Sequence, residues 1–338
     1  MNEKKWDVYV CGDVNVDLAA PGVKRIPAPG QEEEIPYMGT YPGGGAALFT
    51  MGIGKLGLHP VFQGVVGDDF YGRMLKEELE AVHVDTSLLA VDKEGSTGIS
   101  ISFTDASDRS FLTYRGTGQR KPAVAADMAM MKQARHIHVT GYEGSRDQEI
   151  YETFLKRVKE ETEASVSFDV GWDAGGEWSR GIYQLLPFID ILFMNETEAL
   201  HYSRLSSADK AAADFAEVCG QAVVKLGSRG AVAVKEGAVY YGKAYPVTAV
   251  DTTGAGDSFN AGYVYGFLKG LDVPGCLRCG NGCGALSVTR LGGNTGFPDE
   301  AGLLALIGET AKCDGKPAET MKSSGKERES SKAPCTQL

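Results

Sequence analysis

The 338-residue chain has no apolar run that approaches the roughly 18 residues of a membrane-spanning helix. Its amino-terminal segment also lacks the sustained apolar stretch of a secretion signal, because Asp7, Asp13 and Asp17 interrupt it. No long basic stripe offsets the formal net charge of -11, so neither nucleic acid nor an anionic membrane is an expected partner. We expect a cytoplasmic protein.

Cysteine is scarce, and seven residues form an odd set that suits reduced thiols better than a disulfide framework. Cys276, Cys279 and Cys283 share a helical face, but they lie among small residues without a nearby His or fourth Cys. A zinc site would need four ligands, so we favour core packing. His136 and His138 alternate along a predicted strand, and we expect burial or an edge contact rather than metal binding.

Glycine, in contrast, is abundant, and its 44 residues cluster between apolar segments without a repeat. Such clusters are typical of backbone that turns tightly or approaches a ligand closely. The segment 52–57 (GIGKLG) fits the dinucleotide-binding pattern G-x-G-x-x-G, which is the basis of a rival interpretation as an NAD-dependent oxidoreductase. That pattern requires a strand before it, whereas these glycines fall late in a predicted helix. We favour a packing role.

Strand-like and helix-like segments alternate along most of the chain, which predicts βαβ units. The predicted strands are 6–11, 61–67, 136–141, 165–172, 190–195 and 221–227, followed by an edge-like meander over 230–247. The predicted helices are 46–58, 70–82, 147–161, one near residue 181, 196–205, 257–271 and a last pair around the loop 289–298. This order predicts an α/β fold with three layers, in which helices flank a mostly parallel β-sheet on both faces.

Two further parts of the chain do not follow this alternation of strands and helices. The alternating runs 98–104 and 110–116 flank a polar turn and predict a hairpin. We expect a small β-sheet lid built from roughly 14–40 and 96–118, within one domain over 1–313. The segment 314–338 is polar and nearly free of large apolar residues, so we expect a disordered tail.

The strongest chemical signal is the segment 251–259 (DTTGAGDSF). Gly254 and Gly256 let the backbone curl so that successive N–H groups converge, and the helix that follows adds its own N–H groups and positive dipole end. Such a turn can hold a phosphate oxygen, and Asp257 in the first helical turn can serve as a base. A helix cap with a favourably placed carboxylate would explain the same residues equally well.

Three other polar clusters follow predicted strands, at the edge where open α/β sheets bind ligands. The clusters are Asn15 and Asp17 with glycines 43–45, then Asn195 with Glu198, and then Lys225, Gly227 and Ser228. Turn chemistry is the better explanation for each cluster alone. Their joint occurrence at strand ends favours a single site.

Over residues 6 to about 305 the chain resembles the ribokinase-like (PfkB) family of carbohydrate and nucleoside kinases. The segment 251–267 is similar to the carboxyl-terminal signature of that family, and 42–57 with 64–79 to its amino-terminal signature. NETEA (195–199) and KLGSRGA (225–231) are similar to its nucleotide-side motifs. The resemblance implies an ATP-dependent kinase that transfers the γ-phosphate to a hydroxyl of a sugar or sugar-like molecule.

The resemblance also implies roles for single residues. Asp257 would be the catalytic base, with an anion hole formed by the backbone N–H groups of Gly254, Ala255 and Gly256. Asn15, Asp17, Gly43 and Gly44 would contact the substrate, whereas Lys225, Gly227 and Ser228 would face the nucleotide. Asn195 and Glu198 would help to place Mg2+ and the phosphates through water. Asp251 and Thr253, with backbone near Ser287 and Gly293, match positions that bind a monovalent cation such as K+ in some members. The lid of such kinases often also forms a homodimer contact.

The sequence departs from many sugar-binding members at two positions. Where those members have a Lys and an Asn, this chain has Gly45 and Leu48, which argues against ribose itself. Tyr114, Arg115 and Glu143 are candidate replacements, and Arg115 can pair with a carboxylate or phosphate through its bidentate fork. A solvated lid arginine is the alternative.

Two alternatives share the fold. A nucleoside kinase would use the same site, and a non-catalytic sugar-binding protein would keep only the cleft. The intact Gly-Ala-Gly turn and Asp257 argue against the second. The residues do not choose among a hexose, a keto-sugar acid, a nucleoside and a sugar phosphate as acceptor.

Overall fold

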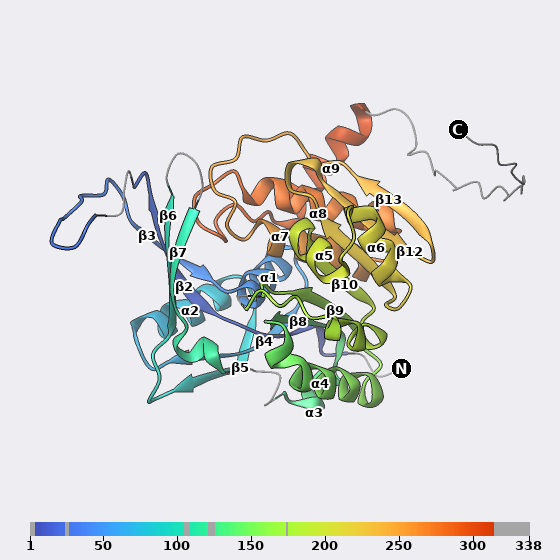
Figure 1. Cartoon of the computed structure of the whole chain (residues 1–338), viewed down its shortest axis with the longest axis horizontal. Coiled ribbons are helices and arrows are strands. Elements are labelled where there is room, and N and C mark those ends of the chain that lie inside the picture. Colours follow the sequence, from blue (N-terminus) through green and yellow to red (C-terminus); the bar gives the residue numbers. More distant parts are fainter. Residues whose placement is uncertain (1–3, 24–26, 105–108, 121–125, 174, 314–338) are drawn as a thin grey trace, which may run out of the picture.

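The computed structural model describes residues 4–23, 27–104, 109–120, 126–173 and 175–313 (Figure 1). The tail that we predicted over 314–338 lies outside these residues. Among the described helices, none is both long and apolar enough to cross a bilayer.

Nine strands form the main sheet, in the order β13-β12-β11-β10-β9-β8-β1-β4-β5. Their bounds are β1 Trp6–Cys11, β4 Pro60–Gly67, β5 Asp85–Asp92, β8 Ala134–Tyr142, β9 Ser165–Val170, β10 Ile191–Asn195, β11 Gln221–Lys225, β12 Ala231–Lys235 and β13 Ala238–Gly242. From β11 to β5 all neighbouring strands are parallel, and β12 and β13 add an antiparallel edge. The predicted mostly parallel sheet with a terminal meander is therefore confirmed.

Alternate residues of the central strands point into two separate cores, because successive side chains of a strand face opposite ways. One core lies under α3 Met128–Met131, α4 Gln148–Glu161, α5 Glu196–Ser203 and α6 Ala208–Ala216. The other lies under α1 Gly45–Lys55, α2 Phe70–Ala81, α7 Ala255–Leu268, α8 Val273–Ser287 and α9 Glu300–Cys313. The three predicted layers are present (Figure 1).

Three segments differ from the sequence-based expectations. The helix predicted near residue 181 is instead a pair of 3-10 turns, Arg180–Gln184 and Leu186–Phe188, with Pro187 at the start of the second. Proline has no N–H to donate, which disfavours a continuous α-helix here. The edge strand β5 and the alanine-rich helix α6 had no counterpart in the sequence analysis.

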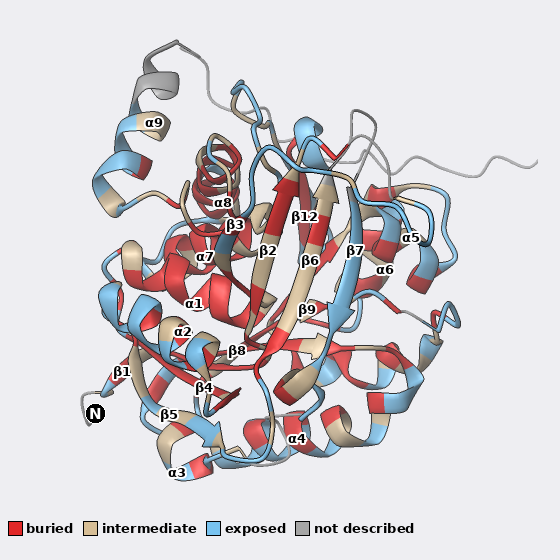
Figure 2. Ribbon diagram, turned by 90° about the vertical axis from the view of Figure 1, so that its left-hand side faces the viewer, coloured by how far each residue is buried: buried red, intermediate tan, exposed pale blue. Residues whose placement is uncertain are grey.

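A second sheet has the strand order β3-β2-β6-β7 and stands beside the carboxyl ends of the main strands (Figures 1 and 2). Its strands are β2 Asn15–Pro21, β3 Gly39–Gly43, β6 Gly98–Thr104 and β7 Arg109–Tyr114. The antiparallel β6–β7 pair confirms the predicted hairpin, although its turn, 105–108, is outside the described residues. Because β2 follows β1 after three residues, the lid is tied directly to the central strand.

Small residues allow α1, α7 and α8 to pack at close range. A Cβ on Gly52 would lie 2.8 Å from the Ala261 Cβ, and one on Gly262 would lie 2.7 Å from Cys283 Sγ. Cys276, Cys279 and Cys283 are all buried in this layer, as predicted. Gly52 also belongs to the G-x-G-x-x-G match, so its packing role is confirmed.

The two histidines of β8 are buried and bonded to serines of the neighbouring strand. The His136 ring nitrogens lie 2.7 Å from the hydroxyls of Ser165 and Ser167. His138 Nδ1 lies 2.6 Å from the same Ser167 hydroxyl. Burial lowers the pKa of both rings, so they are neutral core residues, as expected.

Candidate active site

The segment 251–259 forms the predicted turn and helix start. Gly254 has φ +72° and is the residue immediately before α7, and a side chain there would overlap the Gly293 carbonyl. Only glycine adopts this backbone without strain. The Ala255 N–H donates to the Thr252 carbonyl at 3.3 Å, while Gly256 and Asp257 belong to the first helical turn, which has no carbonyl partners of its own.

Asp257 is enclosed by other acidic groups and one lysine. Burial, followed by the carboxylate of Asp169, raises the pKa of Asp257 to about 8, whereas Lys225 opposes the shift. Asp13 and Asp17 contribute in the same direction as Asp169. A carboxyl group with a pKa near neutrality is suited to accept a proton from a hydroxyl.

On the substrate side, Asn15 and Asp17 lie together with the paired glycines. Asn15 Nδ2 donates to Asp17 Oδ1 at 2.9 Å, and the Asp17 carboxylate occupies the space that a side chain on Gly43 would fill. Burial raises the pKa of Asp17 to about 7, although the hydrogen bond from Asn15 opposes this. Gly44 has φ +92°, which favours glycine at that position.

Asp13, which the sequence analysis did not select as a site residue, organises this region. Its carboxylate accepts from the N–H groups of Gly45 (3.0 Å) and Ala46 (3.1 Å), and from the Thr140 hydroxyl (3.0 Å). It thereby ties the start of α1 to β8. In the sequence, Asp13 can be recognised only as an aspartate that comes two residues after a buried strand. Asn15 and Asp17 also follow that strand, so the sequence does not single out Asp13.

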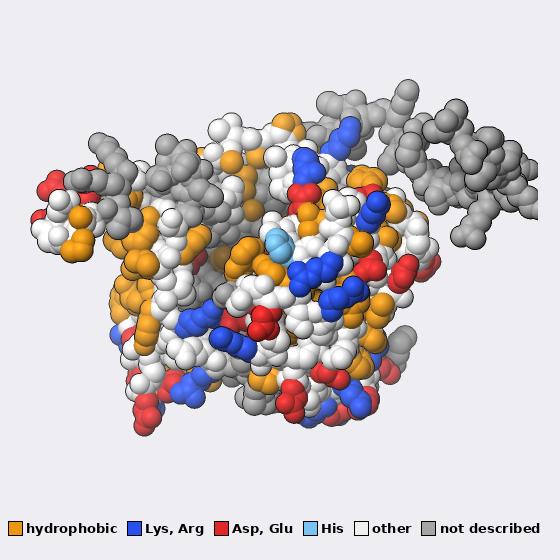
Figure 3. Space-filling view, viewed as in Figure 1, with side chains coloured by type: hydrophobic (Ala, Val, Ile, Leu, Met, Phe, Trp, Pro, Cys, Tyr) orange, Lys and Arg blue, Asp and Glu red, His pale blue; other side chains and the backbone are white. Residues whose placement is uncertain are grey.

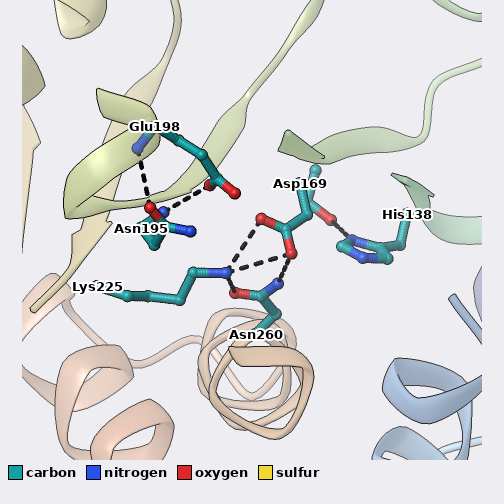
Figure 4. A network of polar contacts seen from close by, with 7 residues as sticks. His138, Asp169, Asn195, Glu198, Lys225 and Asn260 are labelled. Atoms are coloured by element: carbon teal, nitrogen blue, oxygen red, sulfur yellow. Dashed lines mark hydrogen bonds and ion pairs between the residues drawn. The ribbon is translucent and has the colours of Figure 1, made fainter. Parts of the chain in front are cut away.

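On the nucleotide side, Asn195 and Glu198 form a capping box at the start of α5. Asn195 Oδ1 accepts from the Glu198 N–H (2.9 Å), and Glu198 Oε2 accepts from the Asn195 N–H (2.8 Å). Burial, followed by the Asp169 carboxylate, raises the pKa of Glu198 to about 7. The motif therefore caps the helix α5, as turn chemistry alone would explain. The Glu198 carboxylate is also close enough to interact electrostatically with Asp169 and Lys225, which Figure 4 shows.

Lys225 is held in place more firmly than the sequence indicated. Its ammonium bonds to Asp169 and Asn260, neither of which the sequence analysis selected (Figure 4). A charged residue inside the apolar strand 165–172 was the one available signal for Asp169. No feature of the sequence indicated a role for Asn260, because polar residues are common in helices.

A cavity of about 470 Å³ opens beside this cluster, and the predicted nucleotide residues line it except for Asn195 and Glu198. Lys225, Gly227 and Ser228 line it on one side, and Gly256 at the start of α7 on another. Its remaining wall is mainly apolar, from Tyr245, Pro246, Val247, Ala249, Phe259, Ala285 and Val288. An apolar wall with a few polar groups and helix N–H groups at one end fits an aromatic base joined to phosphates.

A smaller cavity of about 230 Å³ lies at the carboxyl ends of β8 and β9. Arg115 and Glu143 line it as an ion pair, together with Arg146, Asp173 and other polar residues. The structure thus places the two candidate substrate contacts side by side, with the Arg115 side chain 48% exposed.

The residues matched to a monovalent-cation site also cluster. Asp251 Oδ1 accepts from the N–H (2.9 Å) and the hydroxyl (2.7 Å) of Thr253, and its Oδ2 accepts from the Gly292 N–H (2.9 Å). Gly293 packs against Gly254, as described above. The Ser287 hydroxyl donates to the Gly284 carbonyl (2.8 Å). The backbone carbonyl of Ser287, at the end of α8, faces the loop that contains Gly293 and Gly296.

A parallel sheet with polar groups at its carboxyl edge and a small sheet beside them define the ribokinase fold. A solved structure of a putative ribokinase II from E. coli, in complex with ATP and Mg2+, matches with a TM-score of 0.78 and 26% identity, over 90% of this chain and 99% of that one.

The chain belongs to the pfkB family of carbohydrate kinases, whose family model matches residues 5–300. An uncharacterized sugar kinase of Archaeoglobus fulgidus is 32% identical over 73% of this chain and 98% of its own length. A fructokinase of Vibrio alginolyticus is 28% identical over 89% of this chain and 99% of its own length. The rival interpretation as an NAD-dependent oxidoreductase is wrong, because the glycine pattern starts in the last turn of α1 and runs past its end, with no strand directly before it, and the family is one of kinases.

Proposed function

We propose that this protein transfers the γ-phosphate of ATP to a hydroxyl of a sugar or sugar-like small molecule, with Asp257 as the base. The observation that carries the proposal is the position of Asp257. Its carboxyl group stands in the first turn of α7, beside the glycine turn that lines the larger cavity, and its other neighbours are the substrate-side residues Asp13 and Asp17.

In the proposed reaction the acceptor oxygen forms a bond to the γ-phosphorus as the bond from that phosphorus to the β,γ-bridging oxygen breaks. The proton of the hydroxyl moves to Asp257, and ADP leaves with the electron pair. The N–H groups of Gly254, Ala255 and Gly256 would stabilise the negative charge on the migrating group. Positioning and charge neutralisation account for most of the catalysis in such reactions.

The remaining groups have binding roles in this proposal. Asn15, Asp17, Gly43 and Gly44 would orient the acceptor, with Arg115 and Glu143 at its far end. Gly227 and Ser228 would contact the nucleotide. Mg2+, held through water by Asn195 and Glu198, would neutralise charge on the phosphate oxygens. A K+ ion beside Asp251 and Thr253 would brace the turn at Gly254.

The outer surface of the lid supports a homodimer as part of the proposal. Strand β7 is the outermost strand of the lid sheet, and Leu112 and Tyr114 on it are 62% and 56% exposed. Figure 3 shows hydrophobic side chains gathered over the lid, on the left of that view. An uncovered strand edge flanked by apolar side chains can pair with a second copy.

The direct test is ATP consumption with a panel of hexoses, keto-sugar acids, sugar phosphates and nucleosides. Acceptor-dependent formation of ADP supports the proposal, and the best acceptor separates a sugar kinase from a nucleoside kinase. Binding of a sugar without ATP turnover, seen as a thermal shift at high ligand concentration, would support the non-catalytic alternative instead.

A further inference from the structure

Lys225, Asp169 and Asn260 form a closed triangle of buried polar side chains (Figure 4). Lys225 Nζ donates to both Asp169 oxygens, at 3.1 and 3.2 Å, and to Asn260 Oδ1 at 3.2 Å. Asn260 Nδ2 completes the triangle by donating to Asp169 Oδ2 at 2.7 Å. The three residues come from β11, β9 and α7, so the triangle joins two strands of the sheet to the helix that carries Asp257.

The triangle is too buried to be an ordinary surface ion pair. The side chains of Lys225 and Asp169 are only 14% and 13% exposed, and Asn260 is fully buried. Removing two charges from water costs free energy that their attraction often only balances, so apolar residues of similar size would stabilise the fold at least as well. Stability alone is therefore a weak explanation for this arrangement.

The position of the ammonium indicates another role. A Cβ built on Gly256 would lie 3.4 Å from Lys225 Nζ, so the charge stands directly against the glycine turn. Lys225 also lines the 470 Å³ cavity next to Gly227. A fixed positive charge at this point adds to the field of the backbone N–H groups at the start of α7.

We infer that Asp169 and Asn260 are positioning residues, which hold the Lys225 ammonium against the Gly256 turn so that it stabilises the phosphate oxygens during transfer. This inference rests on the proposed function. Without Asp169, the ammonium would be drawn toward the other carboxylates around it, Glu198 and Asp257.

The electrostatics of the site agree with this role. Burial opposes the charge on Lys225, but the carboxylate of Asp169, followed by those of Glu198 and Asp257, raises the pKa of Lys225. The charged groups that act on Asp257 are Asp169 from β9, Lys225 from β11, and Asp13 and Asp17 from the β1–β2 region. Asp169 thus keeps Lys225 protonated and also raises the pKa of the base.

The test is Asp169→Asn, which keeps the shape of the side chain and removes its charge. Loss of a positioned charge lowers kcat by about tenfold or more. It also moves the acidic limb of the kcat/KM profile to lower pH, since Asp257 loses a like-charged neighbour. A purely structural role for Asp169 would lower the melting temperature and leave kcat unchanged.

A double-mutant cycle with Lys225→Met tests whether Asp169 acts through the lysine. In the Lys225→Met background, Asp169→Asn is expected to change kcat by less than about twofold. If the double variant instead lowers kcat by the product of the two single effects, the two residues act independently and the inference is wrong. Recovery of the Asp169→Asn enzyme at higher Mg2+ concentration would also overturn it, because Asp169 would then act through the metal.

Ser167→Ala is the matched control, because Ser167 lies on the same strand and face as Asp169, but its hydroxyl bonds to the two histidines of β8 and not to the triangle. It is expected to lower the melting temperature and leave kcat unchanged. If Asp169→Asn does not fold, Asn260→Ala removes two sides of the triangle without unpairing a charge, and it should lower kcat in the same direction. A wild-type protein without kinase activity would defeat the proposed function, whereas an active wild type with unchanged variants would defeat this inference alone.

Discussion

Gly45 faces the carboxylate of Asp257: a Cβ built on Gly45 would stand 3.1 Å from Asp257 Oδ1. The two residues lie in the first turns of different helices, α1 and α7, so the amino ends of two helices converge at the proposed base. The space in front of this carboxylate exists because residue 45 has no side chain.

Gly45→Ala is therefore expected to displace Asp257 by a few tenths of an ångström and to lower kcat by about tenfold, since reacting groups tolerate little misplacement. The melting temperature should stay the same or rise slightly, because alanine favours helix. Gly308→Ala is the matched control: Gly308 also lies in a helix, but no atom stands within 4 Å of its Cβ position. Equal kcat values for the two variants would contradict the role of Gly45.

Asp257→Asn should lower turnover by at least about 100-fold, because a positioned base typically contributes that much. The substitution preserves size and removes the proton acceptor, so the dissociation constant for ADP should change little. Turnover and ADP affinity can be measured on the same preparation. Near-normal turnover would remove Asp257 from the mechanism.

The raised pKa of Asp257 predicts how pH affects stability. Its folded value of about 8 exceeds the unfolded value of 3.8, so the folded state binds more protons between these two values. The free energy of unfolding contributed by this group therefore falls as pH rises through that window. Relative to the wild type, Asp257→Asn should gain stability as pH rises from about 4 to about 8, as measured by thermal unfolding. A difference in stability between the two proteins that does not change with pH would contradict the raised pKa of Asp257.

The same shift predicts the pH dependence of the reaction. The charged form of Asp257 is needed to accept the proton, so kcat/KM should rise with pH up to about 8 and then level off. A rate that is already constant from about pH 5 would mean that the base titrates at the ordinary value of an aspartate.

Potassium should raise turnover by at least about twofold over sodium at equal ionic strength, if a bound cation braces the turn at Gly254. Asp251→Asn weakens the negative charge at this position and should remove the difference. Equal rates of the wild type in both salts would contradict a potassium site.

The proposed lid dimer can be tested by light scattering after size-exclusion chromatography. Replacing both Leu112 and Tyr114 with lysine places charge on the exposed strand β7, and should convert a dimer into a monomer. A wild type that elutes as a monomer at all concentrations would contradict the lid contact.

The site was predictable from sequence where local chemistry determines it. The glycine turn at 254–256 needs its backbone freedom wherever it occurs, and Asp257 follows it directly in the chain. Asn195 and Glu198 were equally visible, since a capping box involves residues three apart. The same holds for the strand ends that carry Asn15 and Lys225.

The triangle around Lys225 could not be found in this way. Asp169 and Lys225 come from strands separated by β10, and they meet because of the register of three parallel strands, which no local pattern encodes. Asp13 was missed for a related reason: its role depends on α1 returning to the end of β1. The edge strand β5 was missed because its residues are only partly buried, which weakens the apolar alternation.

The close packing of α1, α7 and α8 constrains how this protein can be engineered. A side chain added at Gly52 would push apart α1 and α7, whose first turns frame the base, and one at Gly262 would push α7 away from α8, so random mutagenesis there should mostly inactivate. Libraries that aim to change acceptor preference are better directed at the rim of the smaller cavity, where Gln119 and Arg146 are exposed. The scaffold separates a rigid part that performs the chemistry from a tolerant border that can be diversified.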